Sequence, residues 1–359
     1  MKKTKKLLAC LIAAATMFTM GSTAFASETA ETETKTPVSS VTLTKSYKLE
    51  VDKMNSPAET FNYTVTAAGV TDAASGITKD NMPMPAVTNY TTEYTEGEAT
   101  VEGTTKNFTI NLPEYESVGI YYYTVAETKG NTLGVTYDEK TVTLKVTVVN
   151  NKEGNGFDRY VTVYKNVSKD ESVKLTERQA AFENTYSANS LPVAKVVTGN
   201  LGDKNKAFKV TVTLTNTTGK SMSSNISYNV GEEIKTISKD DWKANTANTA
   251  NTGYTATAEI ELKHGQTTTF TNLPFGVTYE VTEADYTEKN GGYDVPKYTF
   301  TNTNKTVDKA GQNVTITNNK GGEIDTGINL TTLPYILVFA GVIVIAGAAF
   351  ITRRRRYED

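Results

Sequence analysis

The stretch that decides the fold occurs twice, as Gly119-Ile-Tyr-Tyr-Tyr-Thr-Val-Ala-Glu127 and as Gly276-Val-Thr-Tyr-Glu-Val-Thr-Glu283. In each copy apolar and polar residues alternate, which is the pattern of a β-strand with one buried face, and the strand then presents a carboxylate. Each copy follows the same lead-in, Asn111-Leu-Pro113 or Asn272-Leu-Pro274. The repetition predicts two similar β-rich halves.

Two further strands accompany each copy. Upstream, an alternating strand ends in a lysine: Lys45 in Val41-Thr-Leu-Thr-Lys45, and Lys195 in Leu191-Pro-Val-Ala-Lys195. Downstream, another ends in an asparagine: Asn184 in Ala181-Phe-Glu-Asn184, and Asn318 in Val314-Thr-Ile-Thr-Asn318. The order lysine, glutamate, asparagine therefore occurs twice, with each member beside apolar strand residues.

The composition between these strands favours an all-β fold. No long stretch shows helical periodicity, and short segments rich in Thr, Val and Tyr predict strands at 61–66, 108–112, 120–125, 142–149 and 160–164. A body of about 300 residues suits two tandem sandwiches, which we place at 39–187 and 188–322. Ser187-Ala-Asn-Ser190 would link them, and the Asn-Thr-Ala-rich segment 221–253, which contains Trp242, would be a long surface loop.

The N-terminus has the features of an export signal over residues 1–26. It has a lysine-rich head, an apolar run from Leu7 to Ala15, and small residues for cleavage in Ala24-Phe-Ala26. The only cysteine, Cys10, lies in this run, so the mature chain would contain no disulfide. The polar, acidic residues 27–38 are expected to form a flexible lead-in.

The C-terminal residues 323–359 have the features of a sorting tail. Residues 333–352 are apolar and long enough to span a bilayer, and the four arginines at 353–356 would hold the end in the cytoplasm. A plain membrane anchor would explain these two features. The preceding pentapeptide, Glu323-Ile324-Asp325-Thr326-Gly327, favours a sortase substrate that is cut between Thr326 and Gly327.

The charge and the single histidine exclude several classes of function. Loss of the signal and of everything after Thr326 removes eight basic and two acidic residues, which changes the net charge from −3 to −9. That charge argues against a nucleic-acid partner. His264, in the hairpin-turn context Lys263-His-Gly265, is the only histidine, so we expect no metal, no cofactor and no Ser-His-Asp site.

The repeated lysine, glutamate and asparagine predict a covalent cross-link. Burial lowers the pKa of a lysine and raises the pKa of a carboxylic acid, which leaves a neutral pair. A neutral amine can attack the asparagine carbonyl carbon, while the protonated carboxyl hydrogen-bonds the carbonyl oxygen and shuttles protons to the leaving ammonia. The product would be a Lys–Asn isopeptide bond, formed once per site without turnover.

Each of these residues alone has a simpler explanation. A lysine at a strand end is usually solvated, a glutamate after a strand is usually exposed, and an asparagine there is usually a turn residue. Two copies in the same order, each spanning a whole predicted sandwich, favour the cross-link.

Residues 40–327 resemble the two-domain major pilins of Gram-positive pili, whose isopeptide-linkage domains are collagen-adhesin B-type, immunoglobulin-like β-sandwiches. The similarity rests on the strand-end lysines, on Tyr121-Tyr-Tyr-Thr-Val-Ala-Glu127, on Gly134-Val-Thr-Tyr-Asp138, on residues 272–286 and on Ile316-Thr-Asn318. In that family the lysine lies on the first strand of a domain and the asparagine on the last. The resemblance implies bonds between Lys45 and Asn184 and between Lys195 and Asn318, promoted by Glu127 and Glu283.

The resemblance also implies polymerisation. Backbone pilins carry a surface lysine late in the first domain, and a pilin-class sortase joins it to the C-terminal threonine of the next subunit. Lys165 in Tyr160-Val-Thr-Val-Tyr-Lys165 matches that position, and Lys169 and Lys174 are close enough to compete. Most sortase motifs have a proline that kinks the bound peptide, whereas Asp325 stands here beside Thr326, so the cognate sortase must differ or bind the peptide differently.

The sequence therefore predicts an exported, non-enzymatic shaft subunit of a pilus on the cell wall of a Gram-positive bacterium, with a precursor that is transiently anchored in the membrane. Its partners would be the sortase and neighbouring copies of itself, with accessory pilins and peptidoglycan as further candidates. A singly wall-anchored adhesin with the same cross-links is the alternative. A secreted, membrane-anchored enzyme is a third possibility, and the missing catalytic constellation argues against it.

Overall fold

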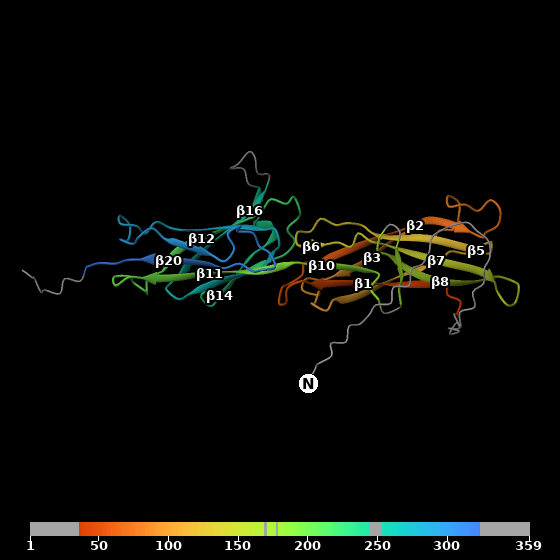
Figure 1. Cartoon of the computed structure of the whole chain (residues 1–359), viewed down its shortest axis with the longest axis horizontal. Helices are drawn as coiled ribbons and strands as arrows, with labels where there is room; N and C mark the ends of the chain where they lie inside the picture. The colour runs from red at the N-terminus through yellow and green to blue at the C-terminus, as the bar shows by residue number, and fades with distance from the viewer. Residues whose placement is uncertain (1–35, 169–170, 177–178, 245–252, 324–359) are drawn as a thin grey trace, which may run out of the picture. The chain divides into compact units, whose positions relative to one another are not determined.

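The structure is a computed structural model that describes residues 36–168, 171–176, 179–244 and 253–323. Within these ranges the one helical element is a short 3-10 turn, η1 (Lys239–Asp241), and the other regular elements are strands (Figure 1). The all-β fold class is therefore confirmed. The same ranges contain no helix long and apolar enough to cross a membrane. The predicted signal at 1–26 and span at 333–352 lie outside the described residues.

Residues 40–186 form two sheets that share one apolar core. The four-stranded sheet has the order β4 (Thr104–Asn111), β1 (Ser40–Leu49), β10 (Phe182–Tyr186), β6 (Val135–Thr136). The six-stranded sheet has the order β3 (Asn89–Tyr94), β2 (Glu59–Thr71), β5 (Gly119–Glu127), β7 (Thr141–Asn150), β8 (Phe157–Asn166), β9 (Ser172–Lys174). β1 and β10 are parallel neighbours, so the first and last strands of this region lie side by side.

Residues 188–319 form a second pair of sheets around a second apolar core. The six-stranded sheet has the order β14 (Glu233–Ile237), β13 (Ile226–Val230), β17 (Thr267–Pro274), β11 (Ala188–Thr198), β20 (Val314–Asn319), β19 (Lys297–Phe300). The four-stranded sheet has the order β15 (Lys243–Ala244), β16 (Tyr254–Leu262), β12 (Phe208–Asn216), β18 (Thr278–Glu283). By compactness, residues 197–204, 285–296 and the described residues from 317 on form a smaller unit of their own.

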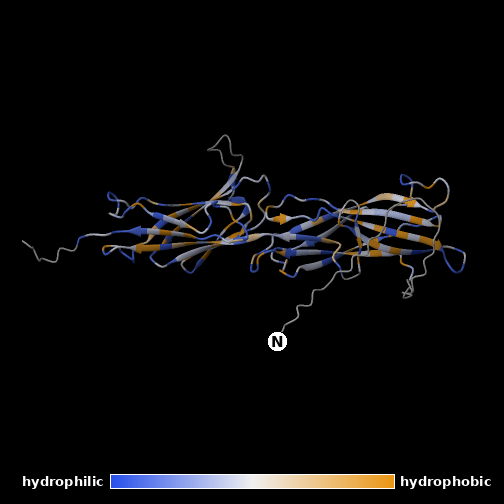
Figure 2. Ribbon diagram, in the orientation of Figure 1, coloured by the Kyte–Doolittle hydropathy of each residue, from blue (hydrophilic) through white to orange (hydrophobic). Residues whose placement is uncertain are grey.

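Strand alternation creates both cores, and Figure 2 shows hydropathy alternating along the strands. On β7, Val142, Leu144, Val146 and Val148 are buried, while the residues between them are half-buried. Burying each such side chain contributes roughly 1.5–3 kcal/mol. The alternation also fixes which polar residues must point inward, because every second residue on a strand faces the same side.

The expected linker at 187–190 is wrong. β10 ends at Tyr186 and β11 begins at Ala188, so only Ser187 separates them. The Ser187 backbone is itself hydrogen-bonded, since its N–H donates to the Gly134 carbonyl at 2.8 Å. The polar composition was misleading because Asn189 and Ser190 are half-buried positions of a strand and not part of a coil.

The expected long loop at 221–253 is also wrong for its described residues, which include β13, β14, η1 and β15. Trp242 packs into the second core with 6% of its surface exposed. Alternating residues in 226–230 and 233–237 allow two strands to pair here, despite the Asn-Thr-Ala repetition that follows. His264 does lie in a turn, between β16 and β17, and Gly265 adopts a φ of 78°. The expected hairpin is wrong, because β16 and β17 belong to different sheets.

Candidate functional site

The first candidate site lies inside the core of residues 40–186, where the two sheets contribute different side chains. Lys45 on β1 and Asn184 on β10 belong to the four-stranded sheet, and Glu127 ends β5 in the six-stranded sheet. Neither Lys45 nor Asn184 stands at a strand end, as the sequence had suggested, because both strands continue past them. Strand alternation turns both side chains inward, and both residues are 0% exposed.

The glutamate contacts both reacting partners. Lys45 Nζ lies 2.5 Å from Glu127 Oε2, and Asn184 Nδ2 donates a hydrogen bond to Glu127 Oε1, also at 2.5 Å. The Asn184 carbonyl oxygen accepts a hydrogen bond from the backbone N–H of Asp138 at 2.7 Å. The expected hydrogen bond from the carboxyl to this oxygen is thus replaced by a main-chain donor, while the carboxyl contacts the amide nitrogen.

Burial sets the ionisation of this pair. Desolvation lowers the pKa of Lys45 to about 8, although attraction to Glu127 opposes the shift. Desolvation raises the pKa of Glu127 against the opposing pull of Lys45. Lys45 Nζ also lies 4.4 Å from the centroid of the Phe61 ring, which is 1% exposed and helps to exclude water. Both pKa shifts favour the neutral amine and the neutral acid.

The second candidate site has the same lysine–glutamate pair, with Lys195 on β11 and Glu283 at the end of β18, again from two different sheets. Lys195 Nζ lies 2.9 Å from Glu283 Oε1, and neither side chain is more than 1% exposed. Desolvation lowers the pKa of Lys195. Phe208 takes the place of Phe61, with its ring centroid 4.1 Å from Nζ. Asn318 is fully buried on β20.

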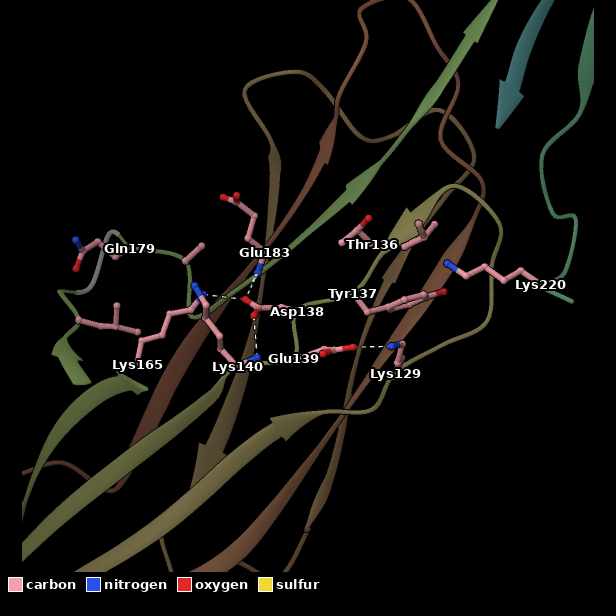
Figure 3. A pocket seen from close by; sticks show the side chains of 13 residues that line it. Lys129, Thr136, Tyr137, Asp138, Glu139, Lys140, Lys165, Gln179, Glu183 and Lys220 are labelled. Carbon is pink, nitrogen blue, oxygen red and sulfur yellow. Dashed lines mark hydrogen bonds and ion pairs between the residues drawn. The ribbon is translucent and has the colours of Figure 1, made fainter. Parts of the chain in front are cut away.

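Lys165 lies at the wall of a pocket of ≈ 840 Å³, which Figure 3 shows from close by. Its side chain is only 16% exposed, because Nζ forms an ion pair at 2.8 Å with Asp138 Oδ2. Of the two competing lysines, Lys174 is exposed on β9, and Lys169 lies outside the described residues. In the sorting motif, Glu323 is exposed, and Ile324, Asp325, Thr326 and Gly327 lie outside the described residues.

Three residues of these sites were not singled out from the sequence: Asp138, Phe61 and Phe208. Asp138 stood within the quoted segment 134–138, but its backbone contact with Asn184 depends on loop geometry. The phenylalanines face the lysines across the core, and no sequence spacing reports that relation. Within the described ranges, no group of three or more His, Cys, Asp or Glu side chains could hold a metal ion.

The geometry supports amide chemistry between side chains. A buried amine, a carboxyl that touches both the amine and the leaving nitrogen, and a main-chain donor on the carbonyl oxygen are the groups that aminolysis of an amide requires. The fold and the first site together define a β-sandwich equipped to form an internal isopeptide bond.

Comparison with known families agrees with that class. Residues 41–187 match the Spy0128-like isopeptide containing domain, and residues 189–320 match a domain of unknown function, DUF7601. The expected resemblance to the pilins of Gram-positive bacteria is therefore confirmed.

Individual relatives extend the similarity to nearly the whole chain. A pilin of Streptococcus pyogenes serotype M1 is 28% identical over 352 residues, which is 93% of this chain and 96% of the relative. The crystal structure of a variant of the major pilin from Streptococcus pyogenes aligns with a TM-score of 0.50 at 23% identity, covering 79% of this chain and 99% of that one. The T3.2 major pilin of Streptococcus pyogenes aligns with a TM-score of 0.49 at 22% identity, covering 79% and 98%.

Proposed function

We propose that this chain is the structural backbone subunit of a sortase-assembled pilus on the surface of a Gram-positive bacterium. The observation that carries the proposal is the contact of Glu127 with both Lys45 and Asn184 in a buried core, within a chain similar to a pilin along almost all of its length. The named relatives are pilins, which fits a structural protein and not an enzyme.

The internal cross-link would form in one exchange of bonds. The neutral Lys45 amine attacks Cγ of Asn184, and the negative charge that develops on Oδ1 is stabilised by the Asp138 N–H. Glu127 takes a proton from Nζ and gives one to Nδ2, which it already contacts. The bond between Cγ and Nδ2 breaks, ammonia leaves and the Lys45–Asn184 amide remains. Lys195, Glu283 and Asn318 would do the same in the second half.

The intersubunit bond would form between Lys165 and Thr326 of a neighbouring copy. After the ammonium has lost a proton to solvent, Nζ attacks the Thr326 carbonyl carbon with the help of a pilin-class sortase. The Thr326–Gly327 peptide bond breaks, and the glycine amine leaves with the second proton. The part-buried position of Lys165 on β8, beside a pocket, supports a specific acceptor more than a freely solvated lysine would. Accessory pilins and peptidoglycan would be further covalent partners.

A gel of boiled cell-wall extract tests the shaft against the alternative of a singly anchored adhesin. A shaft subunit gives a ladder of covalent multimers, and an adhesin gives a single band. Lys165→Ala should abolish the ladder and leave exported monomers, whereas Lys174→Ala, the matched control on β9, should keep it. If the ladder persists in Lys165→Ala, Lys165 is not the acceptor, and if the wild-type chain gives one band, the shaft function is wrong.

A further inference from the structure

Asp138 touches both proposed covalent sites of the first half. Its backbone N–H donates to Asn184 Oδ1 at 2.7 Å. Its carboxylate accepts from Lys165 Nζ at 2.8 Å (Figure 3). It lies in the connection between β6 and β7, one residue after Tyr137, whose side chain belongs to the first core. A single residue thus connects the site of the internal cross-link with the candidate acceptor for polymerisation.

The carboxylate of Asp138 is held on three sides. Oδ2 accepts from Lys165 Nζ and, at 3.0 Å, from the backbone N–H of Glu183, while Oδ1 accepts from the backbone N–H of Lys140 at 3.0 Å. Its side chain is only 8% exposed. Burial raises the pKa of Asp138, but the hydrogen bonds from Lys165 and from the two main-chain donors outweigh it, and the net pKa lies below its ordinary value. A fixed, charged acceptor therefore faces the lysine.

We infer that Asp138 is a positioning residue shared by the two sites: its side chain orients Lys165 for joining to the next subunit, and its main chain orients the Asn184 carbonyl for the internal cross-link. The inference rests on the function proposed above. Because Glu183 N–H binds the same carboxylate oxygen as Lys165, the acceptor is held in place only when β10, which carries Asn184, is seated beside β1. A subunit with a misplaced β10 would present a disordered acceptor.

The physical gain is orientation. A lysine side chain has many rotamers, and holding its amine at one place removes a large part of the entropy cost of reaching a reaction geometry. The same ion pair stabilises the ammonium, so a small reagent that needs no orientation should react more slowly with Lys165 than with a free lysine. Positioning therefore predicts opposite effects on two reactions of the same amine.

The chain offers a matched control in the same pocket. Lys129 Nζ and Glu139 Oε1 also form an ion pair, at 2.5 Å, but these side chains are 67% and 68% exposed. An exposed pair of this kind contributes little to structure. Glu139→Gln thus removes a carboxylate one residue away from Asp138 without touching either proposed covalent site.

The first experiment compares the wild type, Asp138→Asn, Glu139→Gln and Lys165→Met. Lysines of the purified proteins are acetylated with a limiting amine reagent and mapped by peptide mass, and cell-wall extracts of strains that express them are run as ladders. In Asp138→Asn, acetylation of Lys165 should rise, because no carboxylate then pairs with its ammonium. The ladder should weaken at the same time. Glu139→Gln should change neither reading.

Two results would overturn the role of the side chain. One is an Asp138→Asn protein whose Lys165 acetylation and ladder both equal the wild type. The other is increased acetylation at Lys129 and Lys140 as well, because that would mean general loosening of the region. Lys165→Met separates this inference from the proposed function. If Lys165→Met still gives a ladder, the acceptor assignment is wrong. If Lys165→Met loses the ladder but Asp138→Asn polymerises normally, only the positioning role of Asp138 is wrong.

A second measurement tests the main-chain role without changing Asp138. The amide N–H of residue 138 should be protected from hydrogen exchange, and its NMR shift should differ between the wild type and Lys45→Met, because the cross-link changes the chemistry of the oxygen that it binds. Rapid exchange, or identical shifts in the two proteins, would show that this N–H does not bind the Asn184 oxygen.

Discussion

The Asn184 side-chain nitrogen lies 2.5 Å from Glu127 Oε1, and the other oxygen of the same carboxyl lies 2.5 Å from Lys45 Nζ. The nitrogen that would leave and the amine that would attack are thus bridged by one acid. This arrangement assigns the proton transfers to a single group, which comes from the opposite sheet.

Removal of that acid should stop the reaction. The mature body, residues 27–326, should be lighter than its sequence mass by two ammonias, and Glu127→Ala and Glu283→Ala should each restore one, because neither proton transfer can then occur at the altered site. Intact-protein mass spectrometry measures this directly. A wild-type mass equal to the sequence mass would rule out both cross-links.

Phe61 and Phe208 should each affect only the cross-link of the lysine that they contact. Phe61→Ala should cost about 3–5 kcal/mol of stability, as large-to-small changes of buried aromatic residues do. It should also admit water to Lys45, restore the ammonium and slow the first cross-link. Phe208→Ala should do the same at Lys195.

The two variants control each other. Each altered protein should regain one ammonia of mass, and proteolysis followed by peptide mapping should locate the missing bond in the altered half. Loss of both bonds in either variant would mean that the phenylalanine supports folding in general and not the local environment of its lysine.

The cross-links should dominate thermal and mechanical stability. Each bond would close a loop of more than a hundred residues, which in the chain-entropy model removes on the order of 5 kcal/mol of unfolded-state entropy. That is a large fraction of the roughly 5–15 kcal/mol of a typical domain. Asn184→Ala should lower the melting temperature of the first half and open it to trypsin, while the second half stays resistant.

Mechanical unfolding experiments should detect the same isopeptide bonds. Lys45 and Asn184 lie on the adjacent, parallel strands β1 and β10, so a bond between them would carry load past the hydrogen-bonded sheet. In single-molecule pulling, the wild type should not extend at either sandwich, and Asn184→Ala should extend at one. Wild-type sandwiches that unfold and lengthen fully would contradict the mechanical role.

The pH dependence of the stability of Asn184→Ala should reveal the lowered pKa of Lys45, because this variant keeps Lys45 and Glu127 but cannot form the bond. The folded pKa of Lys45 is lowered from 10.5 to about 8, so the unfolded chain binds its proton more tightly. The contribution of the neutral amine to stability is therefore complete above the unfolded pKa and is lost as the pH falls towards the folded pKa.

Between pH 8 and about 10, the free energy of unfolding of Asn184→Ala should thus rise by about 2 kcal/mol, at about 1.4 kcal/mol per pKa unit. Denaturant titrations at several pH values measure it, and the double variant Lys45→Met with Asn184→Ala subtracts the other titrating groups. A flat or falling difference between the two proteins would mean that Lys45 is not desolvated.

The sequence by itself determined the fold class and the six residues proposed for the two cross-links. Alternation of apolar and polar residues specifies strands locally, because a strand with one buried face has a period of two. The order of Lys45, Glu127 and Asn184 is repeated by Lys195, Glu283 and Asn318, and the sequence alone shows this repeat. The same local patterns misplaced the linker at 187–190 and the loop at 221–253, since pairing with distant strands decides whether a polar segment is extended.

Only the tertiary structure decided how these residues meet. Glu127 reaches Lys45 and Asn184 from the opposite sheet, and Asp138 holds both Asn184 and Lys165. Phe61 and Phe208 cover the two lysines. In each case the residues that meet lie on different strands or loops. Spacing along a strand reports which face a side chain takes, but not which side chain it faces across a sandwich. That choice follows from the pairing of β1 with β10 and from the packing of one sheet on the other.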